Sequence, residues 1–429
     1  MPNDVLESDE PAAGKASRQL AVDGGIPVRV APWPTYDKGA VFVEPEDEEA
    51  AIRAIRRHLY FRYDSRPQSE TECGRLESAL GDYFGAGHAL VVASGTTALA
   101  LAVMAAGIPP GSLVACPGFA FAATPSAIML AGCRPLLVEV DENLHFDLDD
   151  LARKWTPDIK AIMVVHMRGF ASAMPAITEF AAARGVPVFE DAVPALGVEL
   201  AGRKLGTFGL AGAFSTQSDK ALNSGEGGFL LTGDGALYAR AVVLSGAYEG
   251  RCRRHFPDAV APIGSDLDVP LFSFRMDEIR AALLRSELDR LPIRLKRFRE
   301  NYDHVAAALA GVPGIEVRQP VAPGAYLGES LIFRVPGGSA KWFAGALCGE
   351  GIDARNLGSA TDANVRAFWN WRFMHPGLDA DAIKALLPRT TAYLERAVDV
   401  PLSSTLSLAD CDDLVTAVRK VASAAPGRA

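Results

Sequence analysis

Three groups of polar residues follow apolar runs in this chain, in an order that suggests chemistry on one bound group. Ser94-Gly95-Thr96-Thr97 comes just after the apolar residues 90–92. Asp191 ends a second apolar run, and Lys220 follows it by 29 residues (220 − 191) in a segment rich in Ser, Gly and Asn. Amide and hydroxyl donors at the start of a helix can hold a phosphate dianion, helped by the helix dipole. The order is therefore a candidate phosphate cradle, a candidate buried acid and a lysine.

This order is the set of groups that pyridoxal 5′-phosphate (PLP) requires, because PLP forms a Schiff base with a lysine and needs an acid against its pyridinium nitrogen. A negative charge on Asp191 would keep that nitrogen protonated. Ser215 can donate to the phosphate, and Phe121 could stack on the ring. The glycines of Gly225-Glu226-Gly227-Gly228, shortly after Lys220, would let the backbone pass close to a ligand.

Each of these residues also has an ordinary structural interpretation. Ser94 or Thr96 could cap a helix, and Asp191 could be a surface acid just past the end of a strand. Phe121 could be a core residue, and a lysine in a loop is usually solvated. The hypothesis of a PLP site therefore depends on the order of the residues and on their neighbours rather than on any one of them.

The elements that must position these residues alternate regularly along the chain. The strands are continuously apolar, which indicates that both of their faces are buried. Strands that alternate with helices through short loops predict an α/β fold with a mainly parallel, doubly wound sheet, in which ligands bind at the carboxyl ends of the strands. The expected strands are residues 89–93, 113–116, 135–140, 159–166, 186–191 and 227–232, and the helices between them are 96–106, 122–130, 147–154, 175–184 and 235–244.

The rest of the chain suggests two domains behind a tail. Residues 1–20 are small and polar and are expected to form a flexible N-terminal tail. Residues 21–310 would form the large PLP-binding domain, which ends in a long helix over residues 277–309. Residues 311–429 would form a smaller C-terminal α/β domain. Further helices are expected at residues 46–59 and 69–84, and further strands at 315–318 and 331–335.

Composition excludes several classes of function. The net charge of −9, with no basic block, argues against nucleic acid as a partner. No apolar run reaches the roughly 18 residues of a membrane span, and the acidic start Met1-Pro2-Asn3-Asp4 lacks a hydrophobic signal region. The 6 cysteines are scattered without a CxxC pair, which indicates reduced thiols. We therefore expect a cytoplasmic protein without a metal site.

Several segments together carry a resemblance to a known family. They are Ser94-Gly95-Thr96-Thr97-Ala98-Leu99, residues 117–124, Glu190-Asp191-Ala192, Lys220 with the glycines after it, residues 274–282, and Val400-Pro401-Leu402-Ser403. In this order they resemble the DegT/StrS family of PLP-dependent sugar and cyclitol aminotransferases, which have the aspartate aminotransferase fold (fold type I). The resemblance runs from about residue 22 to residue 423. Residues 21–34 and Gln217 are similar to the branch that aminates inosose rings and related antibiotic precursors.

The resemblance implies a role for each candidate residue. Lys220 would form the Schiff base and move the proton, and Asp191 would pair with the pyridinium. The family works as a homodimer with its site at the subunit interface, where a segment matching Ser273 and Arg275 reaches the neighbour's cofactor. The remaining implied cofactor contacts are Gly95, Thr96, Thr97 and Ser215 around the phosphate and Phe121 on the ring.

The chain departs from the family pattern at three places. Pro194 stands where the family usually has Gln or His near the cofactor's phenolic oxygen, and Ser273 replaces the usual Asn. The substrate-side residues 60–66 also differ from the common sugar-enzyme pattern, so the acceptor need not be a nucleotide sugar. Sister enzymes that dehydrate sugars have His in place of the lysine, and the retention of Lys220 favours transamination.

The resulting hypothesis is an aminotransferase that moves an amino group from glutamate or glutamine to a ketone or aldehyde, such as a keto-sugar or inosose. Carboxylates of the substrates need cations, for which the candidates are Arg251, Arg253, Arg254, His255 and Arg372.

Three alternatives remain open. A PLP-dependent lyase, decarboxylase or racemase would use the same fold. A non-catalytic PLP-fold sensor would need a partner domain, and we expect none in this length. A nicotinamide enzyme fits poorly, because no G-x-G-x-x-G follows the first strand.

Overall fold

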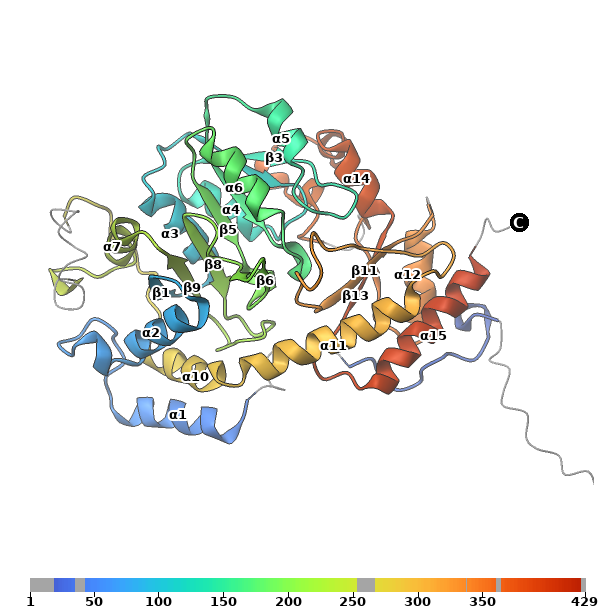
Figure 1. Cartoon of the computed structure of the whole chain (residues 1–429), viewed down its shortest axis with the longest axis horizontal. Coiled ribbons are helices and arrows are strands. Elements are labelled where there is room, and N and C mark those ends of the chain that lie inside the picture. The colour runs from blue at the N-terminus through green and yellow to red at the C-terminus, as the bar shows by residue number, and fades with distance from the viewer. Residues whose placement is uncertain (1–18, 35–42, 253–266, 337, 360–363, 426–429) are drawn as a thin grey trace, which may run out of the picture.

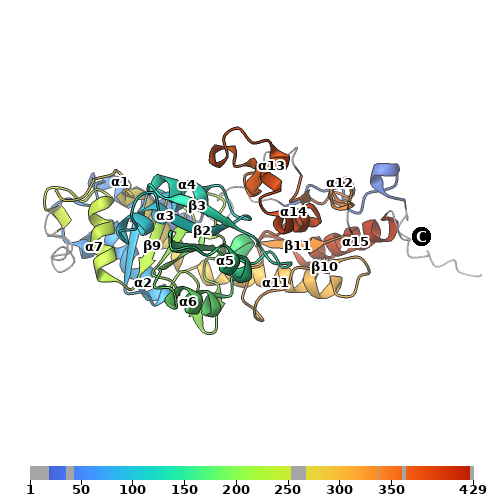
Figure 2. The same ribbon diagram turned by 90° about the horizontal axis from the view of Figure 1, so that it is seen from above.

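The computed structural model describes residues 19–34, 43–252, 267–336, 338–359 and 364–425. Most of the predicted tail 1–20 therefore lies outside the described residues. The chain forms a large part around a seven-stranded sheet and a smaller C-terminal part around a four-stranded sheet, and the two lie end to end (Figures 1 and 2). Helix α11 (Leu291–Leu309) runs from the large part onto the smaller one (Figure 1).

The large sheet has the strand order β1-β9-β8-β5-β4-β2-β3. Every neighbouring pair is parallel except those of β9, which runs antiparallel to both β1 and β8. The predicted mainly parallel α/β sheet is thus confirmed. Its strands are β1 (His88–Val92), β2 (Leu113–Pro117), β3 (Arg134–Val138), β4 (Ile159–Val165), β5 (Val188–Asp191), β8 (Ala211–Ser215) and β9 (Gly228–Thr232).

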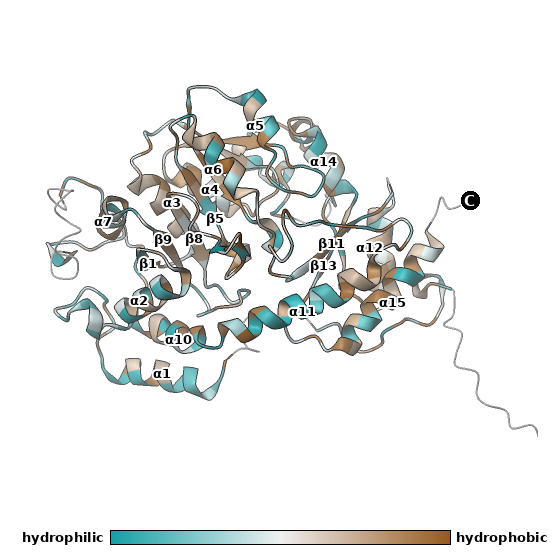
Figure 3. Cartoon of the chain, viewed as in Figure 1, coloured by the Kyte–Doolittle hydropathy of each residue, from teal (hydrophilic) through white to brown (hydrophobic). Residues whose placement is uncertain are grey.

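Both faces of this sheet are buried, as the continuously apolar strands predict. Successive residues alternate between two core clusters, so that Leu90 and Val92 pack on one face and Val91 on the other. Figure 3 shows the strands of this sheet as mostly hydrophobic, whereas α11 carries many hydrophilic residues. Helices α3 (Gly95–Ala105), α4 (Ala123–Leu130) and α7 (Gly235–Leu244) cover the first face, and α2 (Glu72–Phe84), α5 (Leu148–Lys154), α6 (Met174–Ala182) and α10 (Glu278–Leu288) cover the second.

The single long helix predicted over residues 277–309 is wrong, because the structure contains two helices there. Helix α10 ends at Leu288, and α11 begins at Leu291 with Pro292 in its first turn. Proline has no N–H to donate to the carbonyl four residues earlier, and its ring clashes with that carbonyl. It is tolerated in the first turn, where N–H groups have no helical partner, so the chain restarts the helix at this point.

The C-terminal part is built on the antiparallel sheet β10-β11-β13-β12, with α12 (Ala340–Gly349) and α15 (Leu408–Ala424) packed against it. Residues near the start of the chain join this core, because Leu20 and Trp33 are buried in it and the amides of Ala21 and Val28 donate to the Glu350 carboxylate. The domain boundaries at residues 20 and 310 stay a prediction. The strands are β10 (Glu316–Val317), β11 (Ser330–Arg334), β12 (Arg355–Asn356) and β13 (Ala397–Pro401).

The remaining elements are short or peripheral. They are α1 (Pro45–Arg56), β6 (Glu199–Leu200), β7 (Arg203–Lys204), α13 (Ala380–Lys384) and α14 (Pro388–Glu395). Within the described ranges, no helix combines the length and the apolar character that crossing a membrane requires.

A buried ion pair holds the segment before β1 in place. The Arg62 guanidinium lies 2.7 Å from the Glu77 carboxylate of α2, and both side chains are almost fully buried. Glu77 also accepts from the amide of Val91 at 2.8 Å, and Arg62 donates to the Val91 carbonyl at 2.9 Å. Residues 60–66, predicted to lie on the substrate side, therefore include a structural arginine that faces the core.

Substitution of Glu77 by alanine should strongly destabilise the fold. It leaves the Arg62 guanidinium buried without its carboxylate, which we expect to cost about 3–5 kcal/mol of unfolding free energy. The measurement is denaturant-induced unfolding followed by circular dichroism. Glu49→Ala is the matched control, because Glu49 pairs with Arg53 on the exposed surface of α1 and should change the free energy by no more than about 1 kcal/mol. Equal effects of the two substitutions would contradict this assignment.

Candidate active site

A cavity of about 170 Å³ opens at the carboxyl ends of β1, β4, β5 and β8. This is the edge of an α/β sheet where ligands bind. Six predicted site residues line it together, although they are spread over more than a hundred positions of the chain. They are Gly95, Thr96, Phe121, Asp191, Ser215 and Lys220, and the other lining residues are Leu99, Ala123, Val165, Met167, Arg168, Val193, Pro194, Gln217, Asp219, Glu329 and Arg366.

The start of α3 forms one wall of this cavity. Ser94 caps this helix by accepting from the amide of Thr97 at 3.1 Å, and the Thr97 hydroxyl exchanges hydrogen bonds with the backbone of Ser94. The capping interpretation of Ser94 is thus confirmed. The Thr97 hydroxyl is used inside the cap and does not line the cavity, whereas Gly95 and Thr96 do.

Gly95 is required by close approach of the chain. A Cβ atom at this position would lie 2.9 Å from the Cβ of Ser215 and 3.2 Å from the Val193 side chain. Since contacts this short are not tolerated, only glycine lets the start of α3 come this near to the ends of β5 and β8. The result is a shallow cradle of backbone and hydroxyl groups from Gly95, Thr96 and Ser215, of the kind that holds a phosphate.

Asp191 is the buried acid of the cavity, 4% exposed at the last position of β5. Its carboxylate accepts from the Thr124 hydroxyl at 2.7 Å and from the amide of Val193 at 3.3 Å. Burial raises the pKa of Asp191, and the hydrogen bond from Thr124 is the largest effect that lowers it. A cationic nitrogen placed against this carboxylate would stabilise its charged form.

Glu190, the preceding residue, points to the opposite face of the sheet, as the alternation of a strand predicts. Its carboxylate accepts from the amides of Gly206 and Gly209 at 2.8 and 2.7 Å and lies 3.0 Å from Nε2 of His166. Nδ1 of His166 accepts from the amide of Ser172 at 3.1 Å, so Nε2 carries the hydrogen that is donated to Glu190. This network fixes the ends of β4 and β5 and leaves Asp191 to face the cavity.

Lys220 reaches the cavity on a loop that folds back onto itself between β8 and β9. The amide of Thr216 donates to the Gly227 carbonyl at 3.0 Å, and the amide of Ser218 donates to the Gly225 carbonyl at 3.1 Å. Gly227 has a φ of +146°, and a Cβ there would lie 2.4 Å from the Thr216 hydroxyl. Gly227 therefore allows the returning chain to pass close to Thr216, at the start of the loop that carries Lys220.

Ser273 and Arg275 lie beside the carboxyl end of β1, where Arg275 pairs with Val92. Arg275 donates to the Ser273 hydroxyl at 2.7 Å and to the Gly246 carbonyl at 3.1 Å, and its guanidinium lies 5.5 Å from the ring centroid of Phe61 and 5.7 Å from that of Tyr248. Neither residue lines the cavity. Their predicted role in a neighbouring subunit is consistent with this position and stays a prediction.

The cations predicted to bind substrate are not the ones that line the cavity. Arg251 donates to the Tyr63 carbonyl at 3.0 Å, and Arg372 lies exposed in a short 3-10 helix; neither lines the cavity. The predicted candidates Arg253, Arg254 and His255 lie outside the described residues.

Sequence reasoning missed four charged residues of the cavity, Arg168, Asp219, Glu329 and Arg366. Arg168 follows the end of β4 and has a φ of +55°, a left-handed conformation that is uncommon outside glycine and that often marks a functional site. It forms an ion pair with the buried Asp399 of β13. Its place just after a buried strand could have identified it, whereas no local signal marks Glu329 or Arg366. Pro194 also lines the cavity.

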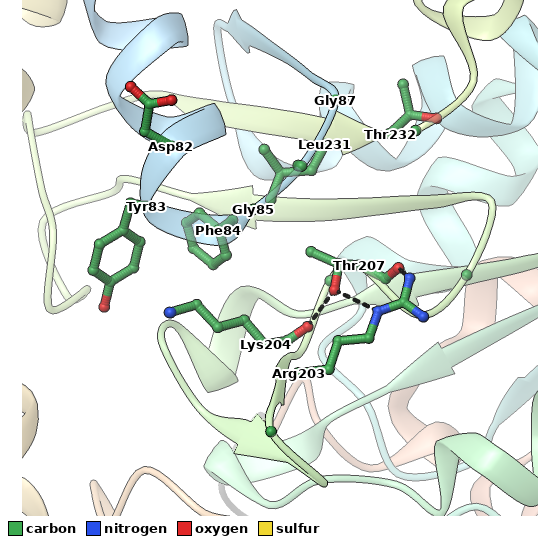
Figure 4. Close-up of a pocket in the computed structure, with 15 residues that line it drawn as sticks. Asp82, Tyr83, Phe84, Gly85, Gly87, Arg203, Lys204, Thr207, Leu231 and Thr232 are labelled. Atoms are coloured by element: carbon green, nitrogen blue, oxygen red, sulfur yellow. Dashed lines mark hydrogen bonds between the residues drawn. The ribbon is translucent and has the colours of Figure 1, made fainter.

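A second cavity, of about 500 Å³, lies at the opposite end of the sheet, beside the starts of β1 and β8 (Figure 4). The basic residues of this second cavity already bind other groups of the protein. Arg203 donates to the Thr207 hydroxyl at 3.1 Å, and Lys204 lies 3.3 Å from Glu199. It lacks the combination of a buried acid and a lysine, so the cavity around Asp191 and Lys220 is the candidate active site.

The residues of that cavity fit PLP. The cradle at Gly95 and Thr96 suits a phosphate, the buried Asp191 carboxylate suits a protonated ring nitrogen, and Lys220 lines the same space. Phe121, half-exposed on the cavity wall, offers a flat apolar surface to an aromatic ring.

Comparison with known proteins supports the same assignment. The model of the DegT/DnrJ/EryC1/StrS aminotransferase family matches residues 64–419. The L-glutamine:2-deoxy-scyllo-inosose aminotransferase of Streptomyces kanamyceticus is 35% identical over 251 residues, which cover 58% of this chain and 56% of that protein. This chain thus spans little more than half of that relative. The 3-amino-5-hydroxybenzoate synthase of Amycolatopsis mediterranei (strain S699) is 28% identical over 368 residues, with 84% of this chain and 88% of that protein covered.

Among solved structures, the crystal structure of 3-amino-5-hydroxybenzoic acid (AHBA) synthase superposes with a TM-score of 0.75 at 25% sequence identity, covering 93% of this chain and 100% of that chain. The fold predicted from the family resemblance is therefore confirmed. Since the family model also covers most of the chain, from before α2 into α15, this chain belongs to the DegT/DnrJ/EryC1/StrS aminotransferase family.

Proposed function

We propose that this protein is a PLP-dependent aminotransferase that moves an amino group from glutamate or glutamine to a keto-sugar, an inosose or a related carbonyl intermediate of secondary metabolism. The observation that carries the proposal is the meeting of Asp191, Lys220 and the Gly95–Thr96 cradle in one cavity. The names of the relatives, an inosose aminotransferase and an aminohydroxybenzoate synthase, support this class of acceptor.

Each residue of the site has its own role in the proposed reaction. PLP, when bound, supplies an electron sink for the charge that develops on the substrate carbon. Asp191 holds a positive charge on the ring nitrogen, and Thr124 and the Val193 amide orient its carboxylate. Nζ of Lys220 takes the proton from the α-carbon of the donor and later returns a proton to the acceptor. Gly95, Thr96 and Ser215 bind the phosphate, and Phe121 packs on the ring.

We also propose that the protein is a homodimer in which Ser273 and Arg275 complete the partner's site. Their position outside their own cavity supports this arrangement, as do Ile52 and Ile55, which are 42% and 44% exposed on α1, and Phe121, which is 48% exposed. A cytoplasmic location is proposed from the thiols, since all 6 cysteines are free and disulfides are rare in that compartment.

Removal of Lys220 tests the reaction. We expect Lys220→Ala to lower the turnover roughly 100- to 10,000-fold, because the group that moves the proton is lost. In the wild-type protein, added PLP should produce a visible absorbance band that L-glutamate or L-glutamine converts to the amine form of the cofactor. Full turnover by Lys220→Ala would contradict the proposal. A product that forms from an amino acid without any carbonyl acceptor would instead indicate a lyase, decarboxylase or racemase.

Substitution of Thr124 by valine tests how Asp191 is positioned. The Thr124 hydroxyl stabilises the ionised carboxylate, so its loss should raise the pKa of Asp191 further. Because Asp191 acts in its ionised form, above its pKa, the acid limb of the pH–rate profile should move to higher pH. Thr124→Ser keeps the hydroxyl and serves as the control. An unchanged acid limb in Thr124→Val would show that this hydrogen bond does not set the charge of Asp191.

Subunit mixing tests the shared site. Lys220→Ala and Arg275→Ala homodimers should each be nearly inactive. After they are unfolded and refolded together, roughly a quarter of the wild-type activity should return, because half of the randomly paired dimers would hold one intact site. Lys220→Ala mixed with wild type is the control for refolding. If the mixture of the two variants stays inactive while the control recovers, Arg275 does not serve a neighbouring subunit. The mass in solution from light scattering checks the dimer directly.

A further inference from the structure

Besides Asp219 and the ion-paired Arg168, two charged side chains of the active-site cavity have no part in the chemistry described above. Glu329 and Arg366 both come from the C-terminal part of the chain and line the cavity together with Lys220. Among the residues that the structure describes, neither has an ion-pair partner. Of the other charged groups, Arg168 pairs with Asp399, Asp191 accepts from the Thr124 hydroxyl, and Asp219 precedes Lys220 in the chain. Glu329 and Arg366 are therefore available to a substrate.

Glu329 is held in place by its backbone. Its carbonyl accepts from the amide of Leu402 at 2.9 Å, and the hydroxyl of the next residue, Ser330, donates to Asp399. The preceding Gly328, with a φ of +91°, packs so closely on α11 that a Cβ there would lie 2.6 Å from the Phe298 carbonyl. The segment cannot move away easily, so the Glu329 carboxylate stays at the cavity.

The Glu329 side chain is half-buried at the cavity, and a carboxylate that loses water there needs a hydrogen-bond donor in its place. Burial raises the pKa of Glu329, and the positive charges of Arg168, Lys220 and Arg366 oppose this effect. A ligand that brings N–H or O–H donors would compensate the cost, whereas a ligand that brings a second carboxylate would be repelled. Glu329 thus favours a neutral, donor-rich group.

Arg366 has the opposite preference. Its guanidinium lies 5.8 Å from the ring centroid of Phe121 and is partly buried. Burial also lowers its pKa, with the neighbouring charge of Arg168 acting in the same direction. A guanidinium that is partly desolvated and that forms no ion pair within the described residues is a site for a carboxylate ligand, which it can bind through two parallel hydrogen bonds.

We propose that Arg366 binds the α-carboxylate of the amino donor and that Glu329 accepts a hydrogen bond from its side-chain amide, so that the cavity selects L-glutamine over L-glutamate. This inference rests on the proposed aminotransferase function and names the donor of that same site. The two amino acids differ only in one end group, an amide or a carboxylate. An amide offers two N–H donors to Glu329, whereas the carboxylate of glutamate places a second negative charge against it.

The test measures the donor half-reaction without any acceptor. PLP-loaded wild-type protein is mixed with L-glutamine or L-glutamate, and the rate of conversion of the cofactor band is recorded. We expect glutamine to be favoured by roughly tenfold or more, which corresponds to one hydrogen bond to a charged group. Glu329→Gln should reduce this preference toward equality, mainly through faster reaction with glutamate. Arg366→Lys should slow both donors and keep their ratio.

A binding measurement gives a second readout. Isothermal titration calorimetry of the PLP-loaded Lys220→Ala variant with each amino acid should show the same preference, which the Glu329→Gln substitution should remove. Asp219→Asn, which removes another carboxylate from the same cavity wall, separates a local effect from a general charge effect and should change the ratio less than Glu329→Gln does.

Three results would overturn the inference. A wild-type protein that converts both donors equally, a Glu329→Gln variant with an unchanged ratio, or one altered only in the acceptor half-reaction would each show that Glu329 does not select the donor. If the wild-type protein converts neither amino acid, the proposed function fails as well, and this outcome is distinct from an active enzyme without a preference.

Discussion

Burial of the Asp191 carboxylate at the carboxyl end of β5 is the interaction on which the candidate site depends. A carboxylate in this position needs donors, and the protein supplies two, the Thr124 hydroxyl and the Val193 amide. The strand order then places the other components around it. Strand β4 lies on one side of β5 and β8 on the other, so that Arg168 follows one neighbour and Ser215 ends the second. Gly95 lies against Ser215 through a contact that only glycine permits.

The two faces of β5 carry consecutive residues with different roles. Glu190 has a structural role, and Asp191 has the role proposed for the chemistry. Glu190 binds the amides of Gly206 and Gly209 together with His166 on one face, and Asp191 opens into the cavity on the other. Because side chains alternate along a strand, a slip of one residue would exchange the two faces. The two glycine amides and His166 therefore hold the register, and the register places the acid.

The groups proposed for the chemistry and those proposed for substrate selection come from different parts of the molecule. The seven-stranded sheet and the loops at its edge supply Asp191, Lys220 and the candidate phosphate cradle, which are the groups proposed to bind and use the cofactor. The C-terminal part supplies Glu329 and Arg366, and it is joined to the large part by the ion pair between Arg168 and Asp399. Relatives with the same cofactor site could therefore differ in their substrates through changes in this smaller part, without loss of the catalytic groups.

Local patterns in the sequence determined the strand–helix alternation, the cap at Ser94, and the identity of Asp191, Lys220 and the glycines around them. These features depend on neighbours within a few residues, through hydrophobic periodicity, capping hydrogen bonds and the conformational freedom of glycine. The break between α10 and α11 at Pro292 has an equally local cause that the pattern of apolar residues concealed. Only the tertiary structure decided that Thr97 serves the cap, that Arg62 is a core residue paired with Glu77, and that Glu329 and Arg366 line the cavity. Such contacts join residues far apart in the chain, and they arise from the packing of whole elements against one another, which no short stretch of sequence encodes.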